Sequence, residues 1–123
     1  DAPRPDERHG HPAAYICMFV DTGLVPMQSA AYVDAGIAAQ TIMLGACEKG
    51  LGGCIVSSFD HTRLKHALMV TIGAYEPLLV IALGKPCENI ILEESGYDTD
   101  CYLDSAAVRH VPKRQLTDII IGI

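Results

Sequence analysis

The sequence predicts a mixed α+β protein, an α/β or α+β sandwich in which helices pack on a sheet. Two apolar runs of strand length, residues 13–20 and 78–83, lie on either side of a long segment with apolar residues at helical spacing, residues 29–49. A third short apolar run, Cys54-Ile55-Val56, follows a glycine-rich turn. Strands that alternate with helices form layers around one core. The 123 residues are therefore predicted to form a single domain.

The composition is that of a folded, acidic protein. Half of the residues (50%) are hydrophobic, which argues against disorder. The formal net charge of −6 argues against a nucleic-acid partner, because such a partner needs a basic face. Aromatic residues make up only 6% of the chain and Trp is absent, so the core is expected to be aliphatic. This core is rich for a monomer of this size, and an oligomer interface would explain the excess.

Cysteine usage indicates a reducing, cytoplasmic location. Five cysteines occur without a C-x-x-C pair, mostly in apolar runs where free cysteine behaves as a small buried hydrophobe: Cys17, Cys47, Cys54, Cys87 and Cys101. The polar, proline-rich start at residues 1–12 lacks the pattern of a signal peptide. The uncharged run at residues 35–47 is shorter than the ~20 residues that span a bilayer, so no membrane is expected.

The N-terminal part of the chain is predicted to run from a loop into a strand. Residues 1–12 contain prolines and a glycine that disfavour regular structure. Residues 13–20 (AAYICMFV) have the composition of a buried strand, which ends at Asp21-Thr22-Gly23. Residues 24–28 are expected to link this strand to the helix.

The helix that follows organises the rest of the chain. Ser29 is expected to cap its N-terminus, and Lys49-Gly50 to end it with a cation and a left-handed glycine. Alanines and glycines alternate with its larger apolar residues, which include Val33, Ile37 and Leu44. A helix that is apolar or small nearly all round is expected to be buried on more than one side. Small residues such as Gly36 and Ala39 would let a second helix pack closely.

After the glycine-rich turn and the short apolar run, the sequence predicts a helix and then a strand. Asp60 is positioned to cap a helix within residues 61–70, with Leu64, Ala67 and Leu68 facing inward. Residues 75–77 (YEP) are expected to turn. Residues 78–83 (LLVIAL) are a continuous apolar run and are expected to form the central strand of the sheet.

The last part of the chain is predicted to be irregular. Residues 87–104 mix acidic and polar residues and are expected to form a surface loop. Arg109, Lys113 and Arg114 form a dense group of cations, which suits a phosphate anchor. A solvated C-terminal patch is the plainer alternative. Residues 115–123 are expected to form an arm or strand packed on their own sheet or on a partner subunit, because their three consecutive isoleucines would favour aggregation if exposed.

The motifs favour a ligand site lined by backbone over a site with catalytic side chains. Gly50-Leu51-Gly52-Gly53 has neither dinucleotide-fingerprint nor P-loop spacing, and its plainer alternative is a helix C-cap with a tight turn. Ser57-Ser58 lacks the frame of a nucleophile elbow. His9 and His11 have no third metal ligand at suitable spacing. We therefore predict no catalytic side chain and no metal site.

Several sequence blocks, taken together, resemble the nitroreductase family. They are Gly36-Ile37-Ala38-Ala39-Gln40, Met43-Leu44-Gly45-Ala46, Gly50-Leu51-Gly52, Ser57-Ser58-Phe59, Gly84-Lys85-Pro86 and Val111-Pro112-Lys113-Arg114. Their order and spacing, from about residue 13 to residue 120, match the C-terminal two-thirds of that family. The resemblance implies a nitroreductase-like α/β sandwich that is shortened at its N-terminus, because the arginine- and serine-rich segment of the family has no counterpart before Ala13.

The resemblance also implies an intertwined homodimer that holds FMN in two sites at the subunit interface, with the long helix in the dimer core. The implied cofactor-binding residues are Ile55, Val56, Ser57, Ser58, Lys113 and Arg114. The first four would lie at the flavin ring, with the backbone of the two serines near flavin N5. The last two would bind the FMN phosphate, where Arg109 is a further candidate.

The implied activity is that of an FMN-dependent oxidoreductase. NAD(P)H would give a hydride to FMN and leave, and the reduced flavin would then reduce a nitro compound, a quinone or a similar small-molecule acceptor in a ping-pong reaction. The flavin would carry the chemistry, which agrees with the lack of catalytic side chains. Two alternatives stay open: a shortened or degenerate relative that dimerises but binds flavin weakly or not at all, and a cysteine-dependent redox protein that uses Cys47 and Cys54.

Overall fold

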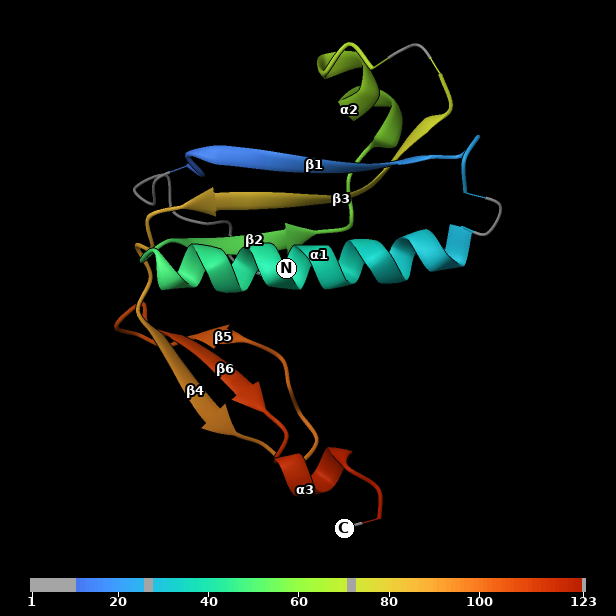
Figure 1. The fold of residues 1–123 in the computed structure, drawn as a ribbon. Helices are drawn as coiled ribbons and strands as arrows, with labels where there is room; N and C mark the ends of the chain where they lie inside the picture. Colours follow the sequence, from blue (N-terminus) through green and yellow to red (C-terminus); the bar gives the residue numbers. More distant parts are fainter. Residues whose placement is uncertain (1–10, 26–27, 71–72, 123) are drawn as a thin grey trace. The chain divides into compact units, whose positions relative to one another are not determined.

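The structure is a computed structural model that describes residues 11–25, 28–70 and 73–122. It divides into two compact units, Asp1–Pro86 (unit 1) and Cys87–Ile123 (unit 2), and each is described by itself. Helices and strands occur in both, which confirms the predicted α+β class (Figure 1). The predicted single domain over residues 1–123 stays a prediction. The predicted loop at residues 1–12 lies almost wholly outside the described residues.

The sheet of unit 1 is antiparallel and has the strand order β1-β3-β2, with β1 at Ala14–Asp21, β2 at Gly52–Val56 and β3 at Tyr75–Gly84. The predicted central position of the LLVIAL run is therefore confirmed, and Ile81 within it is fully buried. The turn predicted at residues 75–77 is wrong, because β3 already begins at Tyr75. Pro77 is tolerated there since the ladder with β1 is irregular between Met18 and Phe19, and prolines in sheets occur at such bulges.

Helix α1 (Gln28–Glu48) has the predicted length and the predicted C-terminal stop. Gly50 has a φ of 70°, its N–H donates to the Cys47 carbonyl at 2.9 Å, and the Leu51 N–H donates to the Ala46 carbonyl at 2.9 Å. These two bonds satisfy the last carbonyls of the helix in a Schellman motif. Ser29 lies inside the first turn, so its predicted position as the N-cap is wrong.

Only one side of α1 is buried within the chain. That side lies along the sheet and packs on β2 and β3 (Figure 1). It consists largely of alanines, with Ala31, Ala35, Ala39 and Ala46 buried. Because an α-helix advances 100° per residue, the larger apolar residues lie on the opposite side. Val33, Ile37 and Leu44 there, which we call the outer face of α1, are 62%, 63% and 63% exposed. Within one chain, the expected burial on more than one side is therefore wrong.

By length and composition alone, the Ser29–Glu48 stretch of α1 would be able to cross a membrane. Core helices of soluble proteins pass the same test. Its alanine side packs on the sheet of unit 1, and 22% of the stretch is buried within the described chain.

Helix α2 (His61–Ala67) has the predicted N-cap, because the Asp60 side chain accepts a hydrogen bond from the Arg63 N–H at 2.9 Å. The prediction of which residues of this helix face inward is only partly correct. Leu64 is half-buried, whereas Ala67 and Leu68 are exposed, since the helix ends after seven residues. The expected burial of the cysteines is also wrong: Cys17 is half-buried and the other four are exposed.

Unit 2 contains a three-stranded sheet of order β4-β6-β5, with β4 at Ile90–Glu94, β5 at Tyr102–Leu103 and β6 at Arg109–Lys113. β4 runs parallel to β6, and β5 runs antiparallel to it. The surface loop predicted over residues 87–104 is therefore wrong where β4 and β5 form. The predicted C-terminal strand is also wrong, because a short helix, α3 (Leu116–Ile119), forms instead. Ile119, at the end of this helix, and Ile120 and Ile121 after it are exposed within the chain, and an arm that contacts a partner stays a prediction.

Candidate functional site

The four residues predicted at the flavin ring lie together at the end of β2 and in the segment that leads to α2. Ile55 and Val56 are the last residues of β2 and pair with Ile81 and Val80 of β3. Ile55 is 40% exposed, and Ser57 and Ser58, which follow the strand, are exposed. Because β2 is an edge strand, the structure presents an accessible apolar side chain beside an accessible stretch of backbone.

Gly53 sets the position of this strand between β3 and α1. A Cβ atom added at Gly53 would lie 2.7 Å from the Ala82 carbonyl oxygen and 2.9 Å from Sδ of Met43. A side chain at this position would therefore push β2 away from the sheet or from the helix. The glycine-rich turn is thus a helix C-cap followed by a close-packed strand, which is the plainer of the two alternatives.

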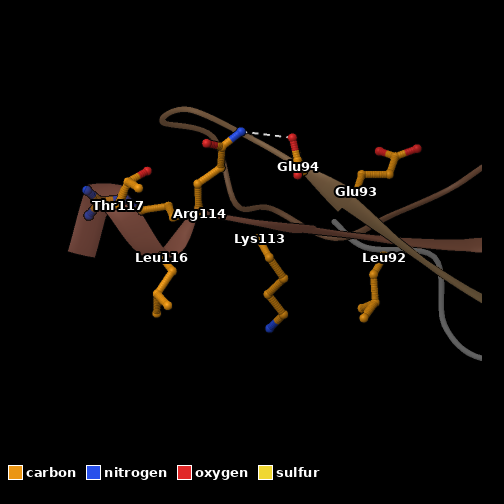
Figure 2. Close-up of a pocket in the computed structure, with 8 residues that line it drawn as sticks. Leu92, Glu93, Glu94, Lys113, Arg114, Leu116 and Thr117 are labelled. Carbon is orange, nitrogen blue, oxygen red and sulfur yellow. Dashed lines mark hydrogen bonds between the residues drawn. The ribbon is translucent and has the colours of Figure 1, made fainter. Parts of the chain in front are cut away.

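The predicted phosphate pair lies in unit 2, where β6 ends. Lys113 is the last residue of β6, and Arg114 follows it before α3. Both line an open pocket of about 400 Å³, which we call the cationic pocket (Figure 2). Its lining residues are Leu92, Glu93, Glu94, Lys113, Arg114, Gln115, Leu116 and Thr117. Figure 2 shows Lys113 on the same side as Leu92 and Leu116, with the two glutamates directed to the other side.

The charges around the cationic pocket are balanced. The Arg114 guanidinium donates to the Asp118 carbonyl at 2.6 Å, and the Gln115 amide donates to the Glu94 carboxylate at 2.8 Å. Among the described residues, Lys113 has no ion-pair or side-chain hydrogen-bond partner. Two cations therefore line a pocket whose lining also includes Glu93 and Glu94, although the carboxylates of these two residues point to the other side from Lys113 (Figure 2). A phosphate would gain charge-assisted bonds from the cations and be repelled by the acids.

Arg109 is not part of this pocket. Its Nε and Nη2 atoms donate to the two carboxylate oxygens of Glu88 at 2.8 and 2.9 Å. This bidentate pair raises the pKa of Arg109 above its ordinary value. These two donors of the guanidinium are thus already bonded to a carboxylate, and the role of Arg109 as a further phosphate ligand stays a prediction.

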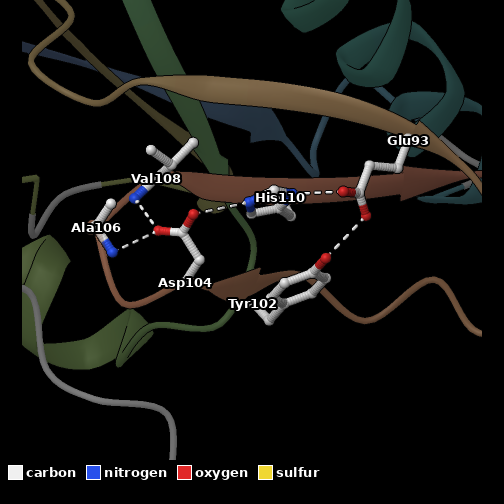
Figure 3. Close-up of polar contacts among 6 residues, drawn as sticks. All are labelled: Glu93, Tyr102, Asp104, Ala106, Val108 and His110. Atoms are coloured by element: carbon white, nitrogen blue, oxygen red, sulfur yellow. Dashed lines mark hydrogen bonds and ion pairs between the residues drawn. The ribbon is translucent and has the colours of Figure 1, made fainter.

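A half-buried histidine on the same strand, His110, was not predicted from the sequence. Nδ1 of His110 lies 2.5 Å from the Glu93 carboxylate, and Nε2 lies 3.3 Å from the Asp104 carboxylate (Figure 3). Tyr102 stacks on the imidazole at a centroid distance of 4.7 Å and donates its hydroxyl to Glu93 at 3.0 Å. We call these four residues the His110 cluster. No local signal indicates them, because they meet only through the pairing of β4, β5 and β6.

The carboxylates shift the protonation of the His110 cluster. The hydrogen bond with Glu93, followed by that with Asp104, raises the pKa of His110 above 6.5. In return, the hydrogen bond with His110 lowers the pKa of Glu93. The pKa of Asp104 is lowered mainly by its hydrogen bond with the Val108 N–H. The cluster therefore favours an imidazolium between two carboxylates, in which both ring nitrogens donate.

The stability of unit 2 is expected to fall as the pH rises above neutrality. A group with a raised pKa in the folded state stabilises fully below its unfolded value, about 6.5 for His, and that contribution is lost as the pH rises through the folded value. The lowered pKa values of the two acids add a separate loss below about pH 4. The urea midpoint of the β6 amide signals should therefore fall between pH 6 and pH 9. In a His110→Gln variant that fall should be absent, and an unchanged fall would contradict the assignment.

The described residues offer no metal centre. Within residues 11–25, 28–70 and 73–122, no group of three or more His, Cys, Asp or Glu side chains could hold a metal ion. His9, which was considered as a ligand, lies outside these ranges. The two predicted sets of site residues are each brought together, one at the end of β2 and one at the end of β6, in separate units.

The comparisons with known proteins bear on unit 1. The model of the nitroreductase family matches residues 6–85, a range that ends one residue before the end of unit 1. The match includes Ile55, Val56, Ser57 and Ser58, whereas Lys113 and Arg114 lie outside it. A comparison with curated proteins gave no match. Because the family model covers well over half of the chain, the protein belongs to the nitroreductase family.

Proposed function

We propose that the protein is an FMN-dependent oxidoreductase that uses NAD(P)H to reduce nitro compounds, quinones or similar small-molecule acceptors in a ping-pong reaction. Family membership supports an oxidoreductase of the flavin type. The observation that carries the proposal to specific residues is the exposed end of β2. This segment lies within the family match and presents Ile55, Ser57 and Ser58 at an accessible sheet edge.

The residues of this chain would divide the binding of FMN between them. Bound FMN would supply the hydride and electron transfer. Ile55 and Val56 would provide apolar surface for the ring, and the accessible backbone at Ser57 and Ser58 would hydrogen-bond to it. Lys113 and Arg114 would make charge-assisted bonds to the phosphate. No side chain is needed as a nucleophile or as a general acid in this scheme.

We further propose that the protein is a homodimer and that the outer face of α1 is its contact surface. Val33, Ile37 and Leu44 together form an apolar stripe that no part of the described chain covers. A second copy would remove this stripe from water at about 25 cal/mol for each Å² buried. We propose a cytoplasmic location with neither nucleic acid nor membrane as a partner, on the basis of the acidic charge and the packing of the alanine side of α1 on the sheet.

FMN binding by the cationic pocket can be tested with a double variant. Replacing Lys113 and Arg114 by alanine is expected to weaken FMN binding by about tenfold to a hundredfold, because each hydrogen bond to a charged group is worth about 1.5–3 kcal/mol and part of it is screened at an open pocket. The measurement is a titration of the purified protein with FMN, followed by flavin fluorescence, together with NAD(P)H oxidation.

The matched control for this titration replaces Arg63 and Lys85 by alanine. This double substitution removes the same charge, but from unit 1. The control variant should bind FMN as the unaltered chain does. Equal affinity in the Lys113/Arg114 variant and the unaltered chain would contradict the phosphate assignment. A chain that neither carries flavin after purification nor oxidises NAD(P)H when FMN is added would contradict the enzymatic proposal.

A second candidate function is favoured by the acids in the cationic pocket. Glu93 and Glu94 lie beside the cations and would oppose a phosphate there. A family member that dimerises but binds flavin weakly or not at all, acting as a binding or structural module, agrees with this feature. A stable dimer without bound flavin, and without flavin-dependent turnover, would establish it.

The cysteine-dependent alternative depends on Cys47 and Cys54. Cys47 and Cys54 are both exposed and have no disulfide partner among the described residues. An exposed thiol reacts when a positive neighbour lowers its pKa. Alkylation of these cysteines without loss of activity would exclude this alternative.

A further inference from the structure

Lys113 and Glu94 occupy paired positions in the sheet of unit 2 and yet form no ion pair. They are register partners in the parallel pairing of β4 with β6. Because neighbouring strands lie about 4.8 Å apart, a lysine and a glutamate at paired positions are within reach of each other. Among the described residues, however, Lys113 has no ion-pair or side-chain hydrogen-bond partner. The sheet therefore leaves unmade an ion pair that its register predicts.

The Glu94 carboxylate points away from Lys113. Side chains alternate between the two faces of a strand, so the period of β4 places Glu94 on the same face as Leu92, two residues before it. Figure 2 shows Lys113 on the same side as Leu92, with the Glu94 carboxylate directed to the other side. Glu94 is the last residue of β4, where the side chain is free to turn. Its direction is therefore set by something other than the period of the strand.

A hydrogen bond from Gln115 accounts for this direction. The side-chain amide of Gln115 donates to Oε2 of Glu94 at 2.8 Å. Gln115 follows the two cations directly and lines the cationic pocket with them. Because Gln115 and Glu94 are both exposed, burial does not fix their side chains. Within the part of the chain that the structure describes, no other side chain bonds to Glu94.

Without this hydrogen bond, Glu94 would compete with an anion for Lys113. A carboxylate paired with Lys113 would occupy the ammonium group that a phosphate would use, and its charge would repel the phosphate. The Arg114 guanidinium already donates to the Asp118 carbonyl. Lys113 is therefore the cation whose availability depends on where Glu94 points.

We propose that Gln115 is a positioning residue of the cationic pocket: it holds the Glu94 carboxylate away from Lys113 and so leaves the ammonium group free to bind a dianionic phosphate group. The inference rests on the proposed function for the identity of that phosphate as part of FMN. Gln115 acts through Glu94, so its effect on the anion disappears when Glu94 loses its charge.

Sulfate is the appropriate probe, because it is a dianion with tetrahedral oxygens like those of a phosphate group. The full chain, labelled with ¹⁵N, is titrated with sulfate at pH 7 while the Lys113 and Arg114 amide shifts are followed. Gln115→Leu keeps a side chain of similar size that cannot donate a hydrogen bond. We expect its sulfate affinity to be about threefold lower, which is the effect of an exposed ion pair that the anion must displace.

A second substitution distinguishes positioning from a loss of folding. Glu94→Gln removes the competing charge, so the double variant Gln115→Leu/Glu94→Gln should bind sulfate at least as tightly as the unaltered chain. Damage to unit 2 by Gln115→Leu would not be repaired in this way. The matched control is Gln40→Leu, which changes an exposed glutamine of α1 and should leave the sulfate affinity unchanged.

The outcomes separate this inference from the proposed function. Unchanged affinity in Gln115→Leu, a loss that Glu94→Gln does not restore, or undetectable sulfate binding by the unaltered chain would overturn the inference. If FMN does not bind while sulfate behaves as expected, the proposed function fails and the inference holds. If FMN binds through Lys113 and Arg114 while Gln115→Leu leaves the sulfate affinity unchanged, the function holds and the inference fails.

Discussion

A Gly53→Val variant is expected to be less stable than the unaltered chain by about 3 kcal/mol, because overpacking of a well-packed site costs about 1–3 kcal/mol and occasionally more. The cost is expected at the upper end, since the first added atom already meets a backbone oxygen, the Ala82 carbonyl, at 2.7 Å. Backbone in the middle of a paired strand cannot move aside as a flexible side chain can. Urea unfolding at a fixed protein concentration measures the change.

The control for this variant is Gly36→Ala. Gly36 lies in α1, and nothing lies within 4 Å of an added Cβ in the chain. Alanine there should stabilise the helix by up to about 1 kcal/mol, because glycine is the poorer helix former. The free energy of unfolding is therefore expected to fall in Gly53→Val and to rise in Gly36→Ala. A Gly53→Val variant as stable as the unaltered chain would show that β2 does not lie as close to β3 and α1 as described.

Replacing Ile37 by aspartate is expected to raise the dissociation constant of the proposed homodimer by at least about a thousandfold. A buried charge without a partner costs about 3–5 kcal/mol, and a symmetric interface would receive the charge from each subunit. Ile37 lies in the middle of the outer face of α1 and is 63% exposed within the chain. The fold of the single chain should therefore tolerate the change, which circular dichroism would report.

Met69→Asp is the matched control for this experiment. Met69 is also an exposed apolar residue of unit 1, at 86%, but it lies outside α1. Its φ of 56° is a conformation that aspartate adopts more readily than most residues. Sedimentation velocity over a range of concentrations measures both variants. A dimer that persists in Ile37→Asp would place the interface elsewhere, and an unaltered chain that is monomeric would end the dimer proposal.

The structure changes which small residues can be used to probe that interface. The sequence predicts that Gly36 and Ala39 let a second helix approach. Ala39 is fully buried against the sheet of its own chain, so a larger residue there would disturb the fold first. Gly36 remains open and can report on a partner. The distinction depends on the side of the helix, which composition alone does not reveal.

The elements of unit 1 could be predicted because their signals are local. The Lys49-Gly50 stop and the Asp60 cap are set by neighbouring residues, and both are confirmed. The side of α1 that packs on the sheet could not be predicted, because both sides are apolar. Alanines line one side, and larger apolar residues line the other. The side that packs is decided by how closely the helix approaches the sheet, and alanine permits the closer approach.

The elements of unit 2 could not be predicted for a different reason. β4 pairs with β6 in parallel across a connection of more than a dozen residues, and β5 contains only Tyr102 and Leu103. In neither strand is there a periodic pattern of apolar residues long enough to be distinguished from the sequence of a loop. The candidate cations were found from their local density. Their acidic neighbours Glu93 and Glu94 come from a distant strand and were missed.

The buried residues are distributed unequally between the two units, and this affects which unit unfolds first. Among the described residues, every buried aliphatic side chain belongs to unit 1, and Pro112 is the buried residue of unit 2. A segment of this size, below about 40 residues, has little apolar area with which to resist local unfolding. Unit 2 should therefore be the less durable part of the chain. A protease would find its first cleavage sites there while the sheet of unit 1 remained closed.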